Sequence, residues 1–174
     1  LLFLLIIVLI FVAGSGDMKK WIDTWFYPRL FDEYVEEYSA EYQIEENMIY
    51  AIIKAESGFC QTAVSPSGAI GLMQVMPETY LSDIRENIGL DGDAEVLFEA
   101  KENIQAGTYY YAKWYHYFGS SVETLAAYNA GIGNVEKWLA DENLSTTSGL
   151  IIEKIPFEET RDYVLRVLSY KTKY

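Results

Sequence analysis

One glutamate lies where a helix would be expected to turn an apolar side chain toward its core. Ile49, Ile52, Ile53 and Glu56 are spaced i, i+3, i+4 and i+7, which places all four on one helical face. Burying a carboxylate raises its pKa, and a helix C-terminus acts in the same direction because the dipole there disfavours negative charge. Glu56 is therefore a candidate general acid near neutral pH. The alternative is a glutamate at a frayed helix end that points into solvent.

Few other side chains are suited to catalysis. The chain has one cysteine, Cys60, and one histidine, His116. A single cysteine cannot form an internal disulfide, and a single histidine cannot build a metal site or a Ser-His-Asp triad by itself. We expect Cys60 to pack as a small hydrophobe or lie exposed, and His116 to be a surface residue and not a base. Carboxylates, hydroxyls and amides must then carry any reaction.

Length and charge limit the classes of function. The 174 residues suffice for one compact domain, and 51% of them are hydrophobic, which is a globular composition. The net charge is −13, with no basic cluster. Binding to nucleic acid or to anionic lipid requires clustered Lys and Arg, so neither is an expected partner.

The first residues are uniformly apolar. Residues 1–13 read LLFLLIIVLIFVA, a run shorter than the roughly 20 residues that a membrane-spanning helix needs. The segment 1–16 is interpreted either as a signal peptide, with Ala13 and Ser15 as a weak cleavage site, or as an N-terminal membrane anchor. A third interpretation, a buried helix of the fold, is less favoured than these two because the run has no polar face. Either favoured reading places the domain, residues 17–174, outside the cytoplasm.

The remaining sequence reads as helices joined by turns. Phe31, Tyr34, Val35 and Tyr38 repeat a helical spacing just after Pro28. Residues 57–71 combine Gly, Ser and Pro without a period and are expected to form a loop that shapes a site. Residues 143–149 are also expected to be a loop. Further helices are predicted over about 45–56, 77–87, 94–118, 121–130, 135–141 and 157–171, so the fold class is all-α.

Four motifs follow one another in a characteristic order. They are AESGF at 55–59, SPSGAIGLMQVMPET at 65–79, AAYNAG at 126–131 and IPFEETRDYV at 155–164. With these motifs the sequence resembles the lytic transglycosylases of the soluble-lytic-transglycosylase, or lysozyme-like, family over about residues 30–174. The resemblance implies a goose-type lysozyme-like helical domain with an active-site cleft.

The same resemblance implies roles for individual residues. Glu56 matches the single catalytic acid, and Tyr163 matches the tyrosine near it on the last helix. Ser65 and Ser67 match loop serines beside the acid and the substrate. The remaining substrate-binding positions are Gly71, Leu72, Met73 and Gln74 on one side of the cleft, and Tyr128 and Asn129 on the other. By residue type alone, Leu72 and Met73 are more typical of core packing.

The implied reaction acts on the glycan strands of peptidoglycan. One Glu protonates the oxygen that links N-acetylmuramic acid to N-acetylglucosamine, and then takes the proton from the C6 hydroxyl that attacks C1. The product has a 1,6-anhydromuramoyl end, and neither a metal nor a cofactor is needed. The domain is expected to be a monomer, with the membrane as a partner only if the N-terminal segment is retained.

Hydrolysis is the nearest alternative. A muramidase of the same fold delivers water to C1, which needs a second carboxylate or a positioned water. The conceivable second carboxylates are Asp83, Glu86, Glu158 and Glu159.

A non-catalytic, membrane-tethered domain that only binds peptidoglycan is an alternative from another class. Such a domain would be expected to have lost the acid or the glutamine of the motifs. Glu56 and Gln74 are both present, which counts against this reading.

Overall fold

The computed structural model describes residues 24–174. The predicted signal peptide or anchor, residues 1–16, lies outside the described residues. Within residues 24–174, no helix is both long enough and apolar enough to cross a membrane.

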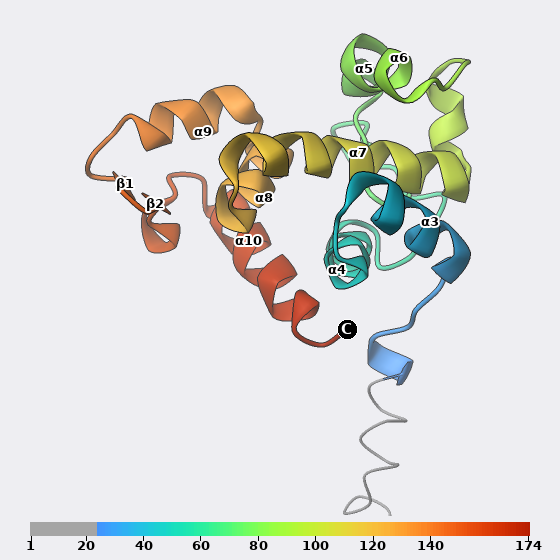
Figure 1. Cartoon of the computed structure of the whole chain (residues 1–174), viewed down its shortest axis with the longest axis horizontal. Coiled ribbons are helices and arrows are strands. Elements are labelled where there is room, and N and C mark those ends of the chain that lie inside the picture. Colours follow the sequence, from blue (N-terminus) through green and yellow to red (C-terminus); the bar gives the residue numbers. More distant parts are fainter. Residues whose placement is uncertain (1–23) are drawn as a thin grey trace, which may run out of the picture.

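Helices form nearly all of the regular structure (Figure 1), which confirms the all-α class. The elements are α3 (Asp32–Tyr42), α4 (Glu46–Glu56), α5 (Pro77–Thr79), the π-helical turn η1 (Tyr80–Ile84), α6 (Arg85–Ile88), the 3₁₀ helix η2 (Ala94–Phe98), α7 (Ala100–Phe118), α8 (Ser121–Ala130), α9 (Ile132–Leu139), β1 (Ser145–Thr146), β2 (Gly149–Leu150), the 3₁₀ helix η3 (Ile152–Lys154) and α10 (Glu158–Lys171).

Several predicted segments differ from the structure. The helix expected over 135–141 is observed at Ile132–Leu139, and the helix expected over 77–87 contains the π-helical turn η1. The single helix expected over 94–118 is divided, because Glu99 is extended (φ −86°, ψ 134°) between η2 and α7. The carbonyl of Leu97 accepts a hydrogen bond from the Asn103 side chain instead of continuing a helical ladder. The polar stretch expected to be a loop forms the antiparallel hairpin β1–β2. With two residues in each strand, it is too short to show an alternating pattern.

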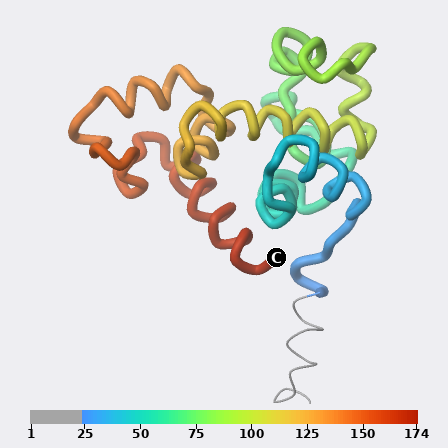
Figure 2. The backbone as a smooth tube through the Cα atoms, viewed as in Figure 1, coloured from blue at the N-terminus to red at the C-terminus, as the bar shows by residue number. Residues whose placement is uncertain are grey.

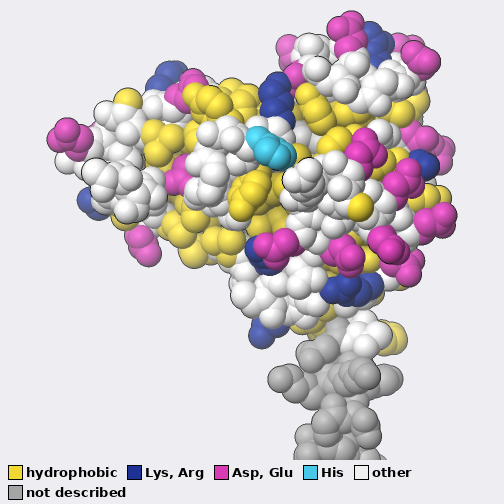
Figure 3. Space-filling view, in the orientation of Figure 1, with side chains coloured by type: hydrophobic (Ala, Val, Ile, Leu, Met, Phe, Trp, Pro, Cys, Tyr) yellow, Lys and Arg dark blue, Asp and Glu magenta, His cyan; other side chains and the backbone are white. Residues whose placement is uncertain are grey.

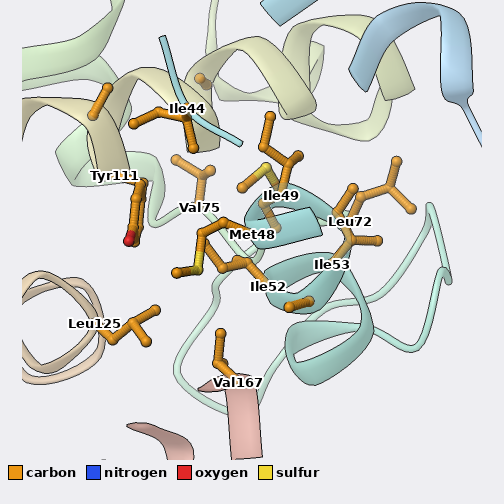
Figure 4. Close-up of a cluster of buried hydrophobic side chains, with 14 of the residues drawn as sticks. Ile44, Met48, Ile49, Ile52, Ile53, Leu72, Val75, Tyr111, Leu125 and Val167 are labelled. Atoms are coloured by element: carbon orange, nitrogen blue, oxygen red, sulfur yellow. The ribbon is translucent and has the colours of Figure 1, made fainter. Parts of the chain in front are cut away.

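Helix α4 is the centre of the core. Every residue from Met48 to Ile53 is buried, so this helix is covered on nearly all sides. Helices α3 and α10 pack against it, while α7 and α8 complete the surrounding layer. Figure 4 shows side chains of α4 in one cluster with Leu72, Leu125 and Val167 from other parts of the chain. The last residue of this central helix is Glu56.

The beginning and the end of the described chain lie side by side (Figure 2). One Arg29 nitrogen, Nη2, donates to the Tyr174 carbonyl at 2.8 Å, and Nη1 donates to the Glu46 carboxylate at 3.0 Å. The Tyr27 ring packs edge-on against Tyr174, with 5.6 Å between centroids. These contacts fasten both ends to α4.

Candidate active site

Glu56 is a partly buried carboxyl group with an unusual acidity. Burial raises its pKa from 4.5 to about 7. The Tyr163 hydroxyl and the Arg166 guanidinium oppose that shift, and the charge of Glu159 adds to it. Glu56 is also the last residue of α4, where the negative end of the helix dipole disfavours an ionised carboxylate. This side chain can therefore both hold and release a proton near neutral pH.

Tyr163 places a hydroxyl beside this acid from α10. Its side chain is 1% exposed, and burial together with the charge of Glu56 raises the pKa of the phenol well above its usual value. Among the described residues the hydroxyl has no hydrogen bond of standard geometry, although it is near enough to Glu56 to lower the pKa of that carboxyl. A small movement of either side chain would complete a bond that favours the ionised acid.

The raised pKa of Glu56 predicts how stability depends on pH. Between pH 4.5 and 7 the folded state retains a proton that the unfolded chain has lost, so the free energy of unfolding falls as pH rises. Over that interval the loss is about 3 kcal/mol, at about 1.4 kcal/mol per pH unit. Glu56→Gln removes this loss. In urea unfolding, the stability of the variant relative to the parent should therefore grow by about 3 kcal/mol from pH 4 to pH 8. A constant difference across that range would contradict the raised pKa.

Ser57 joins the end of α4 to the loop that follows. Its Oγ lies 2.8 Å from the carbonyl oxygen of Leu72 and 3.2 Å from that of Ile53. The first contact crosses from the helix to the Gly71–Gln74 segment. Glu56 is thereby held in a fixed relation to that segment.

Ser65 stabilises a turn within the loop. Its Oγ accepts a hydrogen bond from the Ala69 amide at 3.0 Å, and its own amide donates to the Ala69 carbonyl at 3.0 Å. This turn holds Ser67 on the surface, where its side chain is exposed. Of the two serines, Ser67 has the more accessible hydroxyl.

The Gly71–Gln74 segment passes very close to α7. Gly71 has φ +80°, and a Cβ at this position would overlap the Asn103 side chain and the Leu97 carbonyl. Leu72 and Met73 are 0% exposed, backbone included, and belong to the core. The Met73 amide and carbonyl bond Asn103 and Tyr128, and the Leu72 carbonyl bonds Ser57. The substrate contact expected for these two residues therefore stays a prediction.

Gln74 is held in a left-handed backbone conformation with φ 50°. Its amide nitrogen donates to the carbonyls of Gly71 at 2.9 Å and Ala63 at 3.2 Å. Both amide hydrogens are thus used within the loop. The side-chain oxygen is the group that Gln74 can offer to a ligand as an acceptor.

Tyr128 and Asn129 form the facing wall, at the end of α8. The Tyr128 hydroxyl donates to the Met73 carbonyl at 2.8 Å, and the Asn129 Oδ1 accepts from the Thr160 hydroxyl at 2.7 Å. The second bond orients the Asn129 amide so that its N–H groups remain as donors. A pocket of about 240 Å³ lies between the walls, and its lining includes Gln74, Met76, Tyr110, Tyr128, Asn129 and Gly131.

Asn103 is a residue of this region that the sequence motifs did not reveal. It lies 0% exposed on α7, and its Oδ1 accepts from the Met73 amide at 2.7 Å. Its Nδ2 donates to the carbonyls of Ile70 at 2.9 Å and Leu97 at 2.7 Å. The available signal was position: Asn103 shares the buried face of α7 with Ala100 and Gly107, where an apolar residue is usual.

The four candidate second carboxylates differ in their surroundings. Asp83 forms an ion pair with Lys113 at 2.5 Å, and Glu158 lies 3.8 Å from Arg161. Glu86 is exposed. Glu159 is the one of the four whose charge raises the pKa of Glu56.

Other reactive groups contribute little to this site. Cys60 is exposed, as is His116, whose Nδ1 lies 2.7 Å from the Ala112 carbonyl within its own helix. Among residues 24–174 there is no group of three or more His, Cys, Asp or Glu side chains that could hold a metal ion.

Comparison with known proteins shows the family to which the sequence is related. The family model described as the transglycosylase SLT domain matches residues 33–149. The soluble lytic murein transglycosylase of Escherichia coli K12 is 34% identical over 150 residues, which are 85% of this chain and 23% of that protein. The membrane-bound lytic murein transglycosylase C of Actinobacillus pleuropneumoniae is 31% identical over 161 residues, 80% of this chain and 44% of that protein.

Solved structures of lytic transglycosylases have a similar fold. The 70-kDa soluble lytic transglycosylase of Escherichia coli superimposes with a TM-score of 0.78 at 34% identity, over 85% of this chain and 24% of that one. The lysozyme-like fold expected from the motifs is thus confirmed. This chain spans about a quarter of the length of that soluble relative. It belongs to the transglycosylase SLT domain family.

Proposed function

We propose that this domain is a lytic transglycosylase that cleaves the β-1,4 bond between N-acetylmuramic acid and N-acetylglucosamine in peptidoglycan. The observation that carries the proposal is the buried carboxyl of Glu56, whose pKa is raised to about 7 at the end of α4. A carboxyl with that pKa is protonated often enough to act as an acid and ionised often enough to act as a base.

In the proposed reaction Glu56 moves one proton in each of two steps. It first protonates the glycosidic oxygen, and the bond from that oxygen to C1 of the muramoyl ring breaks. The N-acetyl group of the same ring stabilises the cationic centre at C1. The ionised Glu56 then takes the proton from the C6 hydroxyl as that oxygen bonds to C1, which leaves a 1,6-anhydro end and restores the acid.

The surrounding residues are proposed to hold the sugar rings. Gln74 offers an acceptor, Asn129 offers donors, and the Tyr128 ring supplies a flat apolar face. Ser67, whose side chain is exposed, is a further proposed contact. Tyr163 would stabilise Glu56 in its ionised form during the second step.

Analysis of the reaction products tests the proposal. Digestion of purified glycan strands should give fragments that end in 1,6-anhydromuramic acid, because the C6 hydroxyl and not water attacks C1. Mass spectrometry distinguishes these ends from reducing ends. The control is the same digestion with heat-denatured protein.

The same measurement decides the alternative functions. Reducing ends would indicate a muramidase, for which Glu159 is the best placed second carboxylate because its charge acts on Glu56. Strands retained on the protein without any soluble fragment would indicate a non-catalytic binding domain.

We place the protein outside the cytoplasm, in the cell envelope. Relatives carrying this domain include one named soluble and one named membrane-bound, which is compatible with either a secreted or an anchored form. Residues 1–16 would decide between them, as a cleaved signal or a retained anchor. The proposed domain, residues 17–174, acts as a monomer on glycan strands and needs no cofactor.

A further inference from the structure

A row of aromatic side chains on α7 leads away from the pocket. It consists of Tyr110, Trp114 and Tyr117, which we name the aromatic stripe. We propose that the stripe binds additional sugar rings of the strand whose reacting bond lies at Glu56. The inference rests on the proposed function and extends it to how much of a strand the domain holds.

The stripe follows one face of the helix. Its residues are spaced i, i+4 and i+7, and at a rise of 1.5 Å per residue they extend about 10 Å along α7. Successive rings meet edge to face: the centroids are 5.8 Å apart for Tyr110 and Trp114, and 6.2 Å apart for Trp114 and Tyr117. This arrangement is the favoured one for aromatic pairs, so each ring holds its neighbour in orientation.

The stripe begins inside the pocket described above. Tyr110 lines that pocket, and its ring meets the Tyr128 ring edge-on with 5.5 Å between centroids. The stripe is therefore continuous with the proposed sugar-binding wall. Figure 3 shows hydrophobic side chains gathered at the surface where α7 and α9 meet.

The outer end of the stripe is exposed but fixed. Tyr117 is 62% exposed, and its hydroxyl donates to the Glu136 carboxylate of α9 at 3.2 Å. Trp114 is half-buried, with the Lys113 ammonium 4.9 Å from its ring centroid. Side chains that are already ordered lose little conformational entropy when a ligand binds. One exposed ring would need no explanation, but here it continues a row of partly exposed rings that reaches the pocket.

A glycan strand fits this surface better than a separate protein would. A sugar ring has an apolar face that packs on an aromatic ring and hydroxyls that bond to groups at its rim. Rings of a strand already held at Glu56 are covalently tethered, so their local concentration at the stripe is high. Even weak stacking contacts then increase the affinity for long strands.

The expected result is a loss of preference for long substrates. For each variant, the ratio of kcat/KM on long peptide-free strands to kcat/KM on a muramoyl tetrasaccharide is measured. Tyr117→Ala should lower this ratio about fivefold, equivalent to ~1 kcal/mol. Tyr115→Ala is the matched control, because Tyr115 is 37% exposed on the same helix but stacks on Tyr111 at a different face. This control should leave the ratio unchanged.

A further variant separates stacking from the bond to α9. Tyr117→Phe retains the ring and removes the hydroxyl that bonds Glu136, so it should keep most of the preference. The proposed role of the stripe would be wrong if Tyr117→Phe lowered the ratio as much as Tyr117→Ala, or if Tyr117→Ala left the ratio unchanged. Either result would leave the proposed function intact. If the parent formed no anhydro ends, the proposed function would fail. In that case the binding of long strands to immobilised Tyr117→Ala is compared with their binding to the parent protein. Weaker binding to the variant is expected, and equal binding would overturn the proposed role of the stripe.

Discussion

Glu56→Gln should reduce the formation of anhydro ends by about 10²–10⁴-fold, the usual contribution of a general acid. Glutamine has nearly the shape of glutamic acid and preserves the packing at the end of α4, but it cannot donate a proton to the glycosidic oxygen. The measurement is the initial rate of anhydro-end formation at pH 6, where most of the parent carboxyl is protonated because its pKa is about 7.

A charge-matched control makes this result specific. Glu142→Gln removes the same charge from an exposed position in the turn after α9, and it should retain the parent rate. Circular dichroism should show that Glu56→Gln is folded, since replacing a buried carboxyl by a neutral amide removes a cost of burial. A folded Glu56→Gln protein with the parent rate would refute the role of Glu56.

Asn103→Leu should have the largest effect on stability, lowering the free energy of unfolding by about 3 kcal/mol. Leucine has a similar size but cannot bond the Met73 amide or the carbonyls of Ile70 and Leu97, which meet the asparagine in a buried site. A buried backbone group that loses its partner costs about 1–3 kcal/mol. Urea unfolding monitored by tryptophan fluorescence measures the change.

The control for Asn103 is an asparagine that makes one local bond. Asn87 is exposed, and its side chain donates to the Asp83 carbonyl one turn earlier, so Asn87→Leu should change stability by less than about 0.5 kcal/mol. Asn103→Leu should also lower kcat/KM at temperatures where the variant remains folded, because the Gly71–Gln74 segment would lose its fixed position. A variant with parent stability would show that other contacts hold this segment.

The sequence predicted α4 and the inward position of Glu56 because both depend on local periodicity. Ile49, Ile52 and Ile53 supply the apolar spacing that Glu56 continues, although in the structure every residue from Met48 to Ile53 is buried and not that face alone. The helices at 121–130 and 157–171 were predicted for the same reason and end within about one residue of the observed bounds.

Contacts between distant segments were not predictable from periodicity. The role of Asn103 depends on three backbone groups at residues 70, 73 and 97, and no local pattern reveals them. The break at Glu99 has the same origin, since the Leu97 carbonyl bonds a side chain of α7. Likewise, the motifs suggested substrate contact for Leu72 and Met73, but both residues are 0% exposed and pack in the core.

The wide separation of these partners along the chain has a consequence for biosynthesis. Glu56 gains its full environment only when Tyr163, near the end of the described chain, has packed beside it, and the loop needs Asn103 from α7. Such non-local contacts form late in folding, because loop closure must precede them. A chain synthesised only as far as α8 therefore lacks the tyrosine beside the acid, and Glu56 reaches its folded-state environment only after α10 has packed.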